Sequence, residues 1–276
     1  MIGHILAVAG IEIRIGVRNR WVLLATLILL SFALALGFLG AAPAGEARAG
    51  AMTVTAASLA TLSVYLVPLI ALLLSFDAVA GEIERGALPL LLATPASRAS
   101  VIVGKFLGHL AVLALAVTLG YGIAGALVMA LSGDGLEGAV ALARLIATSI
   151  GLGAAFLAIG YVASASVRQT GAAAALAVGV WLAAVVLYDL ALLGALAADS
   201  EGVFARSVFP WLLVANPADA FRLYNMAALE AGAAATGLGG DAATLPFSPA
   251  WALVSLAGWT AAALAAAVAV FRRLEP

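Results

Sequence analysis

A dense group of charged side chains lies within residues 76–106 of an otherwise apolar chain. Five of the charged residues in this stretch frame a short apolar run, Leu88–Ala93: Glu82, Glu84, Arg85, Arg98 and Lys105. Carboxylate, guanidinium and ammonium groups at this density can form charge-assisted hydrogen bonds that hold a loop in place or bind a partner. The apolar run is too short to cross a bilayer, which takes about 20 helical residues. The residues alone fit equally a short helix that docks onto a soluble partner and one that rests on lipid headgroups.

The sequence lacks the signatures of common catalytic and nucleotide-binding sites. Gly104–Lys105 is followed by Phe106, and no glycine stands five residues before Gly104, so a Walker A phosphate-binding loop is absent. The chain has neither an HExxH zinc motif nor a GxSxG nucleophile elbow, and its two histidines have no metal-ligand spacing. We therefore expect no catalytic residue, metal or cofactor in this chain. His109 is expected to pack as a hydrogen-bonded histidine.

The composition indicates that the bilayer is the main solvent of the chain. Of 276 residues, 65% are apolar and only 10% are charged, whereas about 25% are charged in soluble domains. A net charge of −1 gives no footprint for nucleic acid, and without cysteine there is no disulfide. Six continuous apolar runs predict an all-α integral membrane protein with a single domain, 1–276: Trp21–Gly40, Leu59–Phe76, Phe106–Leu131, Leu145–Ala165, Ala172–Leu196 and Trp251–Phe271.

The distribution of Lys and Arg predicts the orientation of these six spans. With six spans both termini lie on one side, and that side carries nine of the Lys and Arg residues against four on the other. The positive-inside rule then puts both termini in the cytoplasm. Residues 1–20 are predicted to form an interfacial amphipathic helix, or else a plain positively charged anchor. Residues 77–105 become a cytoplasmic loop, and residues 197–250 a periplasmic or re-entrant segment.

The segment before the last span carries clear helix signals. Asn216 suits an N-cap, Pro217 the first helical position, and Asp219 the third, where its carboxylate faces the positive end of the helix dipole. Gly232 is predicted to end this helix. The preceding run, 204–215, is apolar but short, and it is predicted to lie in the outer interface.

The sequence GEIERGALPLLLATPASR (81–98), followed by Gly104–Lys105, resembles the signature loop of ABC-2 type transporter permeases. Ile83, Ala87 and Pro89 depart from the pattern. Thirteen positions match it: Gly81, Glu82, Glu84, Gly86, Leu88, Leu91, Leu92, Thr94, Pro95, Ser97, Arg98, Gly104 and Lys105. The stretch from Glu12 to Trp21 is similar to the amphipathic entry helix of this family. The stretch from Asn216 to Arg222 resembles a segment of its Nos-type branch, which serves nitrous oxide reductase maturation.

This resemblance implies an assembly in the bacterial inner membrane. It implies a homodimer of six-span subunits, two ABC ATPase subunits on the cytoplasmic face, and a periplasmic accessory protein. ATP and Mg²⁺ would be bound by the partner ATPase, so that this chain is a non-catalytic membrane subunit. The charged loop would be a coupling helix seated in a groove of the ATPase, and the assembly would help to build the copper centre of the reductase.

The site predictions concern two groups of residues. We expect the charged members of the loop to hold it in register and its leucines to supply the docking surface; together the ATPase-coupling residues are Glu82, Glu84, Arg85, Leu88, Leu91, Leu92 and Arg98. The resemblance implies a second group at the outer side that contacts the periplasmic partner: Asn216, Asp219, Phe221, Arg222 and Tyr224.

Several alternatives stay open. An ABC-2 permease could instead export a drug, a lipid or a polysaccharide. A secondary transporter would need inverted repeats and charged midplane helices, which the sequence does not show, and no convergent residue set predicts a membrane-embedded enzyme. A copper path is poorly supported, because the chain has no Cys, two His and four scattered Met. The remaining hypotheses are export of a small, sulfur-containing species and mechanical transmission without cargo.

Overall fold

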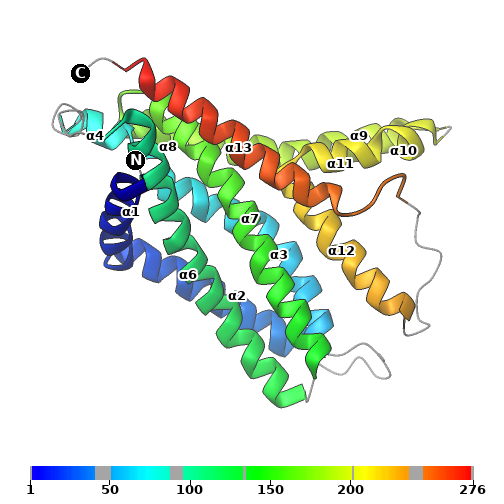
Figure 1. The fold of residues 1–276 in the computed structure, drawn as a ribbon. Coiled ribbons are helices and arrows are strands. Elements are labelled where there is room, and N and C mark those ends of the chain that lie inside the picture. Colours follow the sequence, from blue (N-terminus) through cyan, green and yellow to red (C-terminus); the bar gives the residue numbers. More distant parts are fainter. Residues whose placement is uncertain are drawn as a thin grey trace.

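The computed structural model describes residues 2–40, 51–87, 96–132, 135–200, 202–235 and 245–274. Within these ranges the regular structure is helical, and no residue is in a strand. Figure 1 shows the elements in order: α1 (Ile2–Val17), α2 (Arg20–Gly40), α3 (Ala51–Ser75), α4 (Ala80–Glu84), α6 (Arg98–Ser132), α7 (Leu136–Ser166), α8 (Thr170–Trp181), the π-helical turn η1 (Leu182–Leu187), α9 (Tyr188–Ala198), α10 (Val203–Ser207), α11 (Phe209–Ala215), α12 (Pro217–Ala235) and α13 (Trp251–Arg272).

The helices confirm a multi-pass, all-α membrane protein. Among the described residues five helical segments are long and apolar enough to cross a membrane, and a sixth results if α1 and α2 are counted as one bent span. These five correspond to the predicted second to sixth spans, and α2 covers the predicted first span. A 65° bend separates α1 from α2, and we keep the prediction that α1 lies at the membrane interface, outside the span formed by α2.

Several boundaries differ from the sequence-based prediction, and α3 begins at Ala51 instead of Leu59. α6 begins at Arg98 instead of Phe106, and its 35 residues extend about 52 Å, well beyond a hydrocarbon core of roughly 30 Å. α7 begins at Leu136, so most of the predicted loop 132–144 is helical. α12 continues past Gly232 to Ala235. The reason is shared: Ala, Leu and Glu favour helix in water as well as in lipid, so helices do not stop where apolar runs do.

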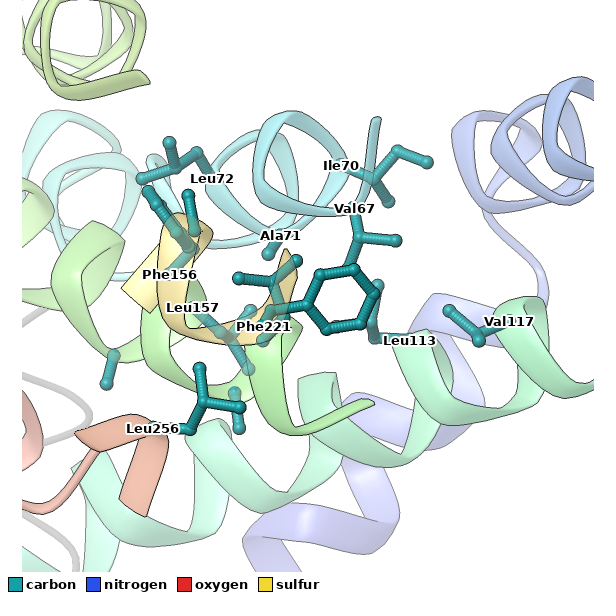
Figure 2. Packing of buried hydrophobic residues seen from close by; sticks show 14 of the residues in the cluster. Val67, Ile70, Ala71, Leu72, Leu113, Val117, Phe156, Leu157, Phe221 and Leu256 are labelled. Carbon is teal, nitrogen blue, oxygen red and sulfur yellow. The ribbon is translucent and has the colours of Figure 1, made fainter. Parts of the chain in front are cut away.

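The core lies where α7 packs against its neighbours. α7 contacts α3, α6 and α13 over much of its length, and α12 closes the far side against α3, α7 and α13. Figure 2 shows side chains from all five helices meeting in this cluster: Val67 and Ala71 of α3, Leu113 of α6, Phe156 and Leu157 of α7, Phe221 of α12 and Leu256 of α13. Since the Phe221 ring is fully buried there, the segment before the last span is fixed to the bundle.

The helix bundle has two ends with different sets of elements. We call the loop end the one that carries α1, α4, the first turn of α6, the first turn of α8 and the last turn of α13; Figure 1 shows the chain's N- and C-terminal helices together there. The far end carries the C-terminal half of α6, the start of α7 and α12, and we include in this name the start of α12, which lies midway along the bundle beside α9 (Figure 1). Helices α10 and α11 turn back beside α9, where the Tyr188 hydroxyl donates to the Leu212 carbonyl at 2.8 Å.

Candidate functional site

The charged loop 77–105 is described as two flanks. The first flank contains α4 and its turn up to Ala87, and the second begins at Ala96 and leads into α6. The predicted docking leucines Leu88, Leu91 and Leu92 lie outside the described residues. The structure therefore shows how the residues on either side of this segment are held in place.

The first flank ends in a tight helix-terminating turn. Gly86 has φ +67°, the left-handed conformation that other residues adopt only at a cost. The Ala87 N–H donates to the Glu82 carbonyl at 2.9 Å, and the Gly86 N–H donates to the Ile83 carbonyl at 3.0 Å. This pair of bonds is the Schellman motif, and it satisfies carbonyls that the end of α4 would leave free. The loop signature thus has glycine at position 86 because this backbone conformation is costly for other residues.

The start of α4 is held by a serine from another span. Ser164 in the last turn of α7 accepts hydrogen bonds from the N–H groups of Val79 and Ala80, both at 3.0 Å. The first N–H groups of a helix have no partner within it, so a side-chain oxygen from a neighbour stabilises the helix start. This contact joins the first flank to the loop end of α7.

Glu84 joins the same flank to the start of α8. The backbone N–H and the hydroxyl of Thr170 both donate to Glu84 Oε2, at 2.8 and 2.5 Å. A carboxylate at this place faces the positive end of the α8 dipole as well as its unpaired N–H groups. The sequence predicted that Glu84 holds the loop, but it gave no sign that Thr170 was its partner.

Arg98 joins the second flank to the end of the last span. Its Nη1 donates to three carbonyl oxygens at the C-terminus of α13, those of Phe271 at 3.1 Å, Arg272 at 3.0 Å and Leu274 at 2.5 Å. Cations are favourable there because the last carbonyls of a helix are unpaired and carry partial negative charge. The preceding Ser97 is the N-cap of α6, and its Oγ accepts from the Ser100 N–H at 3.1 Å.

A buried ionic network ties both flanks to the N-terminal helix. Lys105, the only lysine of the chain, lies 2.5 Å from Glu12 Oε1 of α1 and 3.2 Å from Glu82 Oε1 of α4. His109 Nε2 lies 3.4 Å from Glu12 Oε2, and its Nδ1 is hydrogen-bonded to the Tyr161 hydroxyl at 2.7 Å. The expectation of a packed, hydrogen-bonded His109 is therefore confirmed.

Two glycines allow this network to form. Gly104 and Gly108 lie one turn apart on α6 and face α1. A β-carbon at Gly104 would come within 2.9 Å of the Ile5 carbonyl oxygen, and one at Gly108 within 2.5 Å of Glu12 Cβ and 2.9 Å of the Ala9 carbonyl oxygen. Contacts this close to backbone are not tolerated. The absence of side chains at these positions thus lets α1 approach α6 and brings Glu12 to Lys105.

The network keeps Glu12 ionised. Burial alone would raise the pKa of this carboxyl group, but the hydrogen bond from His109 and the charge of Lys105 outweigh burial and lower the pKa to about 2. Because two carboxylates flank one lysine, the ammonium group is fully used by this pair. Arg85 takes no part: it forms no ion pair with the described residues, and its guanidinium lies over Gly81.

The far-end residues are placed mainly inside the protein. The prediction of a capped helix start is confirmed, because the Ala218 N–H donates to Asn216 Oδ1 at 2.9 Å and α12 begins at Pro217. Asn216 Nδ2 also donates to the Ala184 carbonyl in η1 at 2.6 Å. Asp219 and Phe221 are buried, and Tyr224 is half-buried. Their contact with a periplasmic partner stays a prediction.

Arg222 and two aspartates form a charged cluster at the start of α12. Arg222 Nη2 lies 2.8 Å from Asp189 Oδ2 of α9, and Nη1 lies 3.1 Å from Asp219 Oδ1. Burial and the charge of Asp189 raise the pKa of Asp219 to about 7, although Arg222 acts in the opposite direction. The one guanidinium here serves two carboxylates, so the pair can share a proton near neutral pH.

Sequence reasoning missed the residues that anchor the flanks from elsewhere in the chain. Glu12 is the only acidic residue before Glu46, and Lys105 is the only lysine, so both carried a signal as isolated charges in apolar surroundings. Ser164 and Thr170 carried none, because small hydroxyl residues are common in membrane helices. Within the described ranges no group of three His, Cys, Asp or Glu residues is placed to hold a metal ion.

The fold and the anchored loop define a polytopic membrane subunit that presents a short charged element at one end. The sequence profile of ABC-2 family transporter proteins matches residues 6–275, and the chain belongs to this family. It is 43% identical over 269 residues to a protein of Stutzerimonas stutzeri called "Probable ABC transporter permease protein NosY", an alignment that covers 96% of this chain and 97% of that protein. A protein of the same name from Pseudomonas aeruginosa is 41% identical, with the same coverage.

Proposed function

We propose that this chain transmits force between a separate ATPase subunit and the far side of the bacterial inner membrane. The loop end would face the cytoplasm, and the segment 88–95 would seat in the ATPase as a coupling helix. ATP and Mg²⁺ would be bound by that partner, and chemistry would be absent from this chain. The family supports the role of a transporter membrane subunit.

One observation carries the proposal: the two flanks of the loop are bonded to four other helices. Ser164 belongs to α7, Thr170 to α8, Glu12 to α1, and the carbonyls that Arg98 binds belong to α13, while Lys105 is part of α6 itself. A loop that only rested on lipid headgroups would need none of these bonds. Displacement of the 88–95 segment would instead move the ends of several spans together, which is what coupling requires.

The assembly that this role needs is suggested by the resemblance to Nos-type permeases. Two copies of this chain, two ATPase subunits and a periplasmic accessory protein would form one complex that serves maturation of the copper centre in nitrous oxide reductase. The half-buried face of α12, which includes Arg222 and Tyr224 and is supported from within by Phe221, is our candidate for the periplasmic contact.

We infer that copper does not pass through this chain. Soft thiolate, thioether and imidazole ligands select copper, and the chain has no Cys, two His and four Met. One of the two histidines, His109, is already engaged by Glu12 and Tyr161. The cargo would be a small sulfur-containing species, or the complex would act mechanically on its periplasmic partner.

Co-purification tests the coupling role. Glu84→Ala removes the bond to α8, and Leu91→Asp places a charge on the predicted docking surface. We expect both variants to reach the membrane and to lose most of the bound ATPase from a mild detergent extract. Glu137→Ala, an acidic residue in the exposed first turn of α7 at the far end, is the matched control. Wild-type amounts of ATPase on both loop variants would refute the proposal.

Complementation tests the biological role. The chain should restore nitrous oxide reduction, and the optical spectrum of the copper centre, in a denitrifying bacterium that lacks its own Nos-type permease. Restoration of ATPase binding without restoration of the copper centre would separate the coupling role from the maturation role. It would then favour the export of another cargo.

A further inference from the structure

We propose that a phospholipid with a zwitterionic headgroup, of the phosphatidylethanolamine type, occupies a cavity between α1, α2, α3 and α6 at the loop end. The cavity has a volume of about 560 Å³, within the range of roughly 300–1,000 Å³ that ligand sites occupy. The inference goes beyond the proposed function and does not depend on it, because it concerns a lipid bound to this chain and not the coupling to an ATPase subunit.

The walls of the cavity fit an acyl chain. One wall comes from α2, with Val22, Ala25 and Ile28, and the other from α3. The α3 wall extends from Leu66 to Leu74, which is about 12 Å along a helix. No charged residue lies within either stretch. An empty apolar space of this size is costly, and hydrocarbon is the occupant whose transfer into it is favourable.

The mouth of the cavity faces the bilayer. Three large apolar residues that line it are also exposed on the surface of the chain: Ile15 is 58% exposed, Leu24 46% and Leu73 46%. Neighbouring residues of the same face, such as Leu23 and Leu27, are exposed as well. A water-soluble ligand would have to cross this apolar surface, whereas a lipid reaches the cavity by lateral diffusion.

The polar end of the cavity selects the headgroup. Of the six ionisable residues there, Glu12, Glu82, Lys105 and His109 already satisfy one another through the ionic network. That leaves Asp77 and Arg85, and neither forms an ion pair with any described residue. One guanidinium and one carboxylate match a phosphate and a primary ammonium group, because Arg binds phosphate well and Asp accepts from ammonium. An anionic lipid would leave Asp77 without a partner.

This placement gives the lipid a structural role. Its headgroup would bridge α4, through Arg85, to the turn after α3, through Asp77, on the side of the first flank that the protein's own ion pairs leave open. Its acyl chain would fill the angle made by the 65° bend between α1 and α2. The lipid would thereby complete the anchoring of the loop end.

Native mass spectrometry and lipid extraction test the proposal on the purified full chain, alone or in its complex, after exchange into a lipid-free mild detergent. We expect about one retained phosphatidylethanolamine per chain, enriched over phosphatidylglycerol relative to the source membrane. Arg85→Gln should lower that retention about tenfold, the loss expected for one charge-assisted bond. Arg14→Gln, an exposed arginine of α1 that does not line the cavity, is the matched control and should retain lipid as the wild type does.

A cavity-filling variant makes the test independent of charge. Ala25→Phe should expel the lipid, while Leu127→Phe, on the exposed face of α6, should not. Retention of lipid in the bulk membrane ratio by wild type and all variants, or no retained lipid, would overturn the proposal. The chain has no cysteine, so Leu73→Cys reports on the other occupant: disulfide cross-linking between two copies would show that a second chain closes the mouth, and this too would overturn it.

Discussion

The loop end and the far end of this protein solve the burial of charge in opposite ways. At the loop end, Glu12 and Glu82 flank Lys105, and His109 also bonds Glu12, so that the pKa of Glu12 falls to about 2. At the far end, Asp189 and Asp219 share Arg222, yet burial and mutual repulsion raise the pKa of Asp219 to about 7. The same ratio of carboxylates to cations therefore gives a fixed charge in one place and a titratable one in the other.

The difference teaches what each end can do. The pKa of Glu12 lies far below neutral, so the charge of this carboxylate is constant at working pH, which suits a loop end that passes on a displacement. The far-end cluster holds the start of α12, and its charge can change with the protonation of one carboxyl group. Adaptation to a partner at the far end can then occur without loosening the loop end.

Loss of Lys105 should have the largest effect. Lys105→Met leaves Glu12 ionised and buried without its ammonium partner, and breaking a buried pair in this way costs about 3–5 kcal/mol. We expect little monodisperse protein and a strongly lowered melting temperature, measured by size-exclusion chromatography and thermal unfolding in detergent. Arg14→Met is the exposed control.

A double-mutant cycle separates charge from packing at this site. Glu12→Gln combined with Lys105→Met removes both ends of the pair, so it should recover part of the stability lost in Lys105→Met. An unchanged melting temperature in Lys105→Met, or strictly additive losses in the double variant, would mean that the ion pair between Glu12 and Lys105 does not stabilise the loop end.

Insertion of one methyl group should have the next largest effect. Gly108→Ala forces α1 away from α6, because the new Cβ would meet Glu12 Cβ and the Ala9 carbonyl oxygen, and overpacking of this kind costs about 1–3 kcal/mol. Gly122→Ala on the same helix has nothing within 4 Å and should be neutral or slightly stabilising. The melting temperature should fall in Gly108→Ala and should not fall in Gly122→Ala; equal shifts would contradict the close approach.

The cluster at the start of α12 should make stability depend on pH. A carboxyl group whose pKa is raised on folding contributes stability that is present below the ordinary carboxyl pKa and is lost as pH rises through about 7. The melting temperature should therefore fall by a few degrees between about pH 5 and pH 8. Asp219→Asn should flatten this slope.

Glu12 provides the opposite case. Its lowered pKa gives stability that is present above the ordinary carboxyl pKa and is lost only as pH falls toward about 2, so Glu12 adds no slope between about pH 5 and pH 8. Glu12→Gln should lower the melting temperature equally at both pH values. A flattened slope in Glu12→Gln, with the slope retained in Asp219→Asn, would reverse the comparison.

Glu84→Gln should have the smallest effect on stability. The amide oxygen still accepts a hydrogen bond from Thr170, and only the interaction of a full charge with the α8 dipole is lost at an exposed site. Melting should stay close to that of the wild type. A loss as large as that of Gly108→Ala would show that this flank carries more of the fold than its exposure indicates.

The sequence predicted the spans well and the anchors poorly, for a physical reason. Apolar runs of membrane length specify helices by themselves, and the N-cap Asn216 with Pro217 fixes a helix start locally. The bonds that hold the loop are nonlocal: Thr170 lies 86 residues from Glu84, and Glu12 lies 93 residues from Lys105. Only the packing of α1 on Gly104 and Gly108 brings the latter pair together, and no local pattern encodes that geometry.

Cross-linking from the predicted coupling helix tests the central claim most directly. The chain has no cysteine, so Leu91→Cys introduces a single thiol into this chain for cross-linking in the proposed complex with an ATPase subunit. The account predicts a specific cross-link to the ATPase that is retained in the Asp219→Asn background and is lost in folded Lys105→Met protein. No cross-link to the ATPase, or equal cross-linking in both backgrounds, would contradict it.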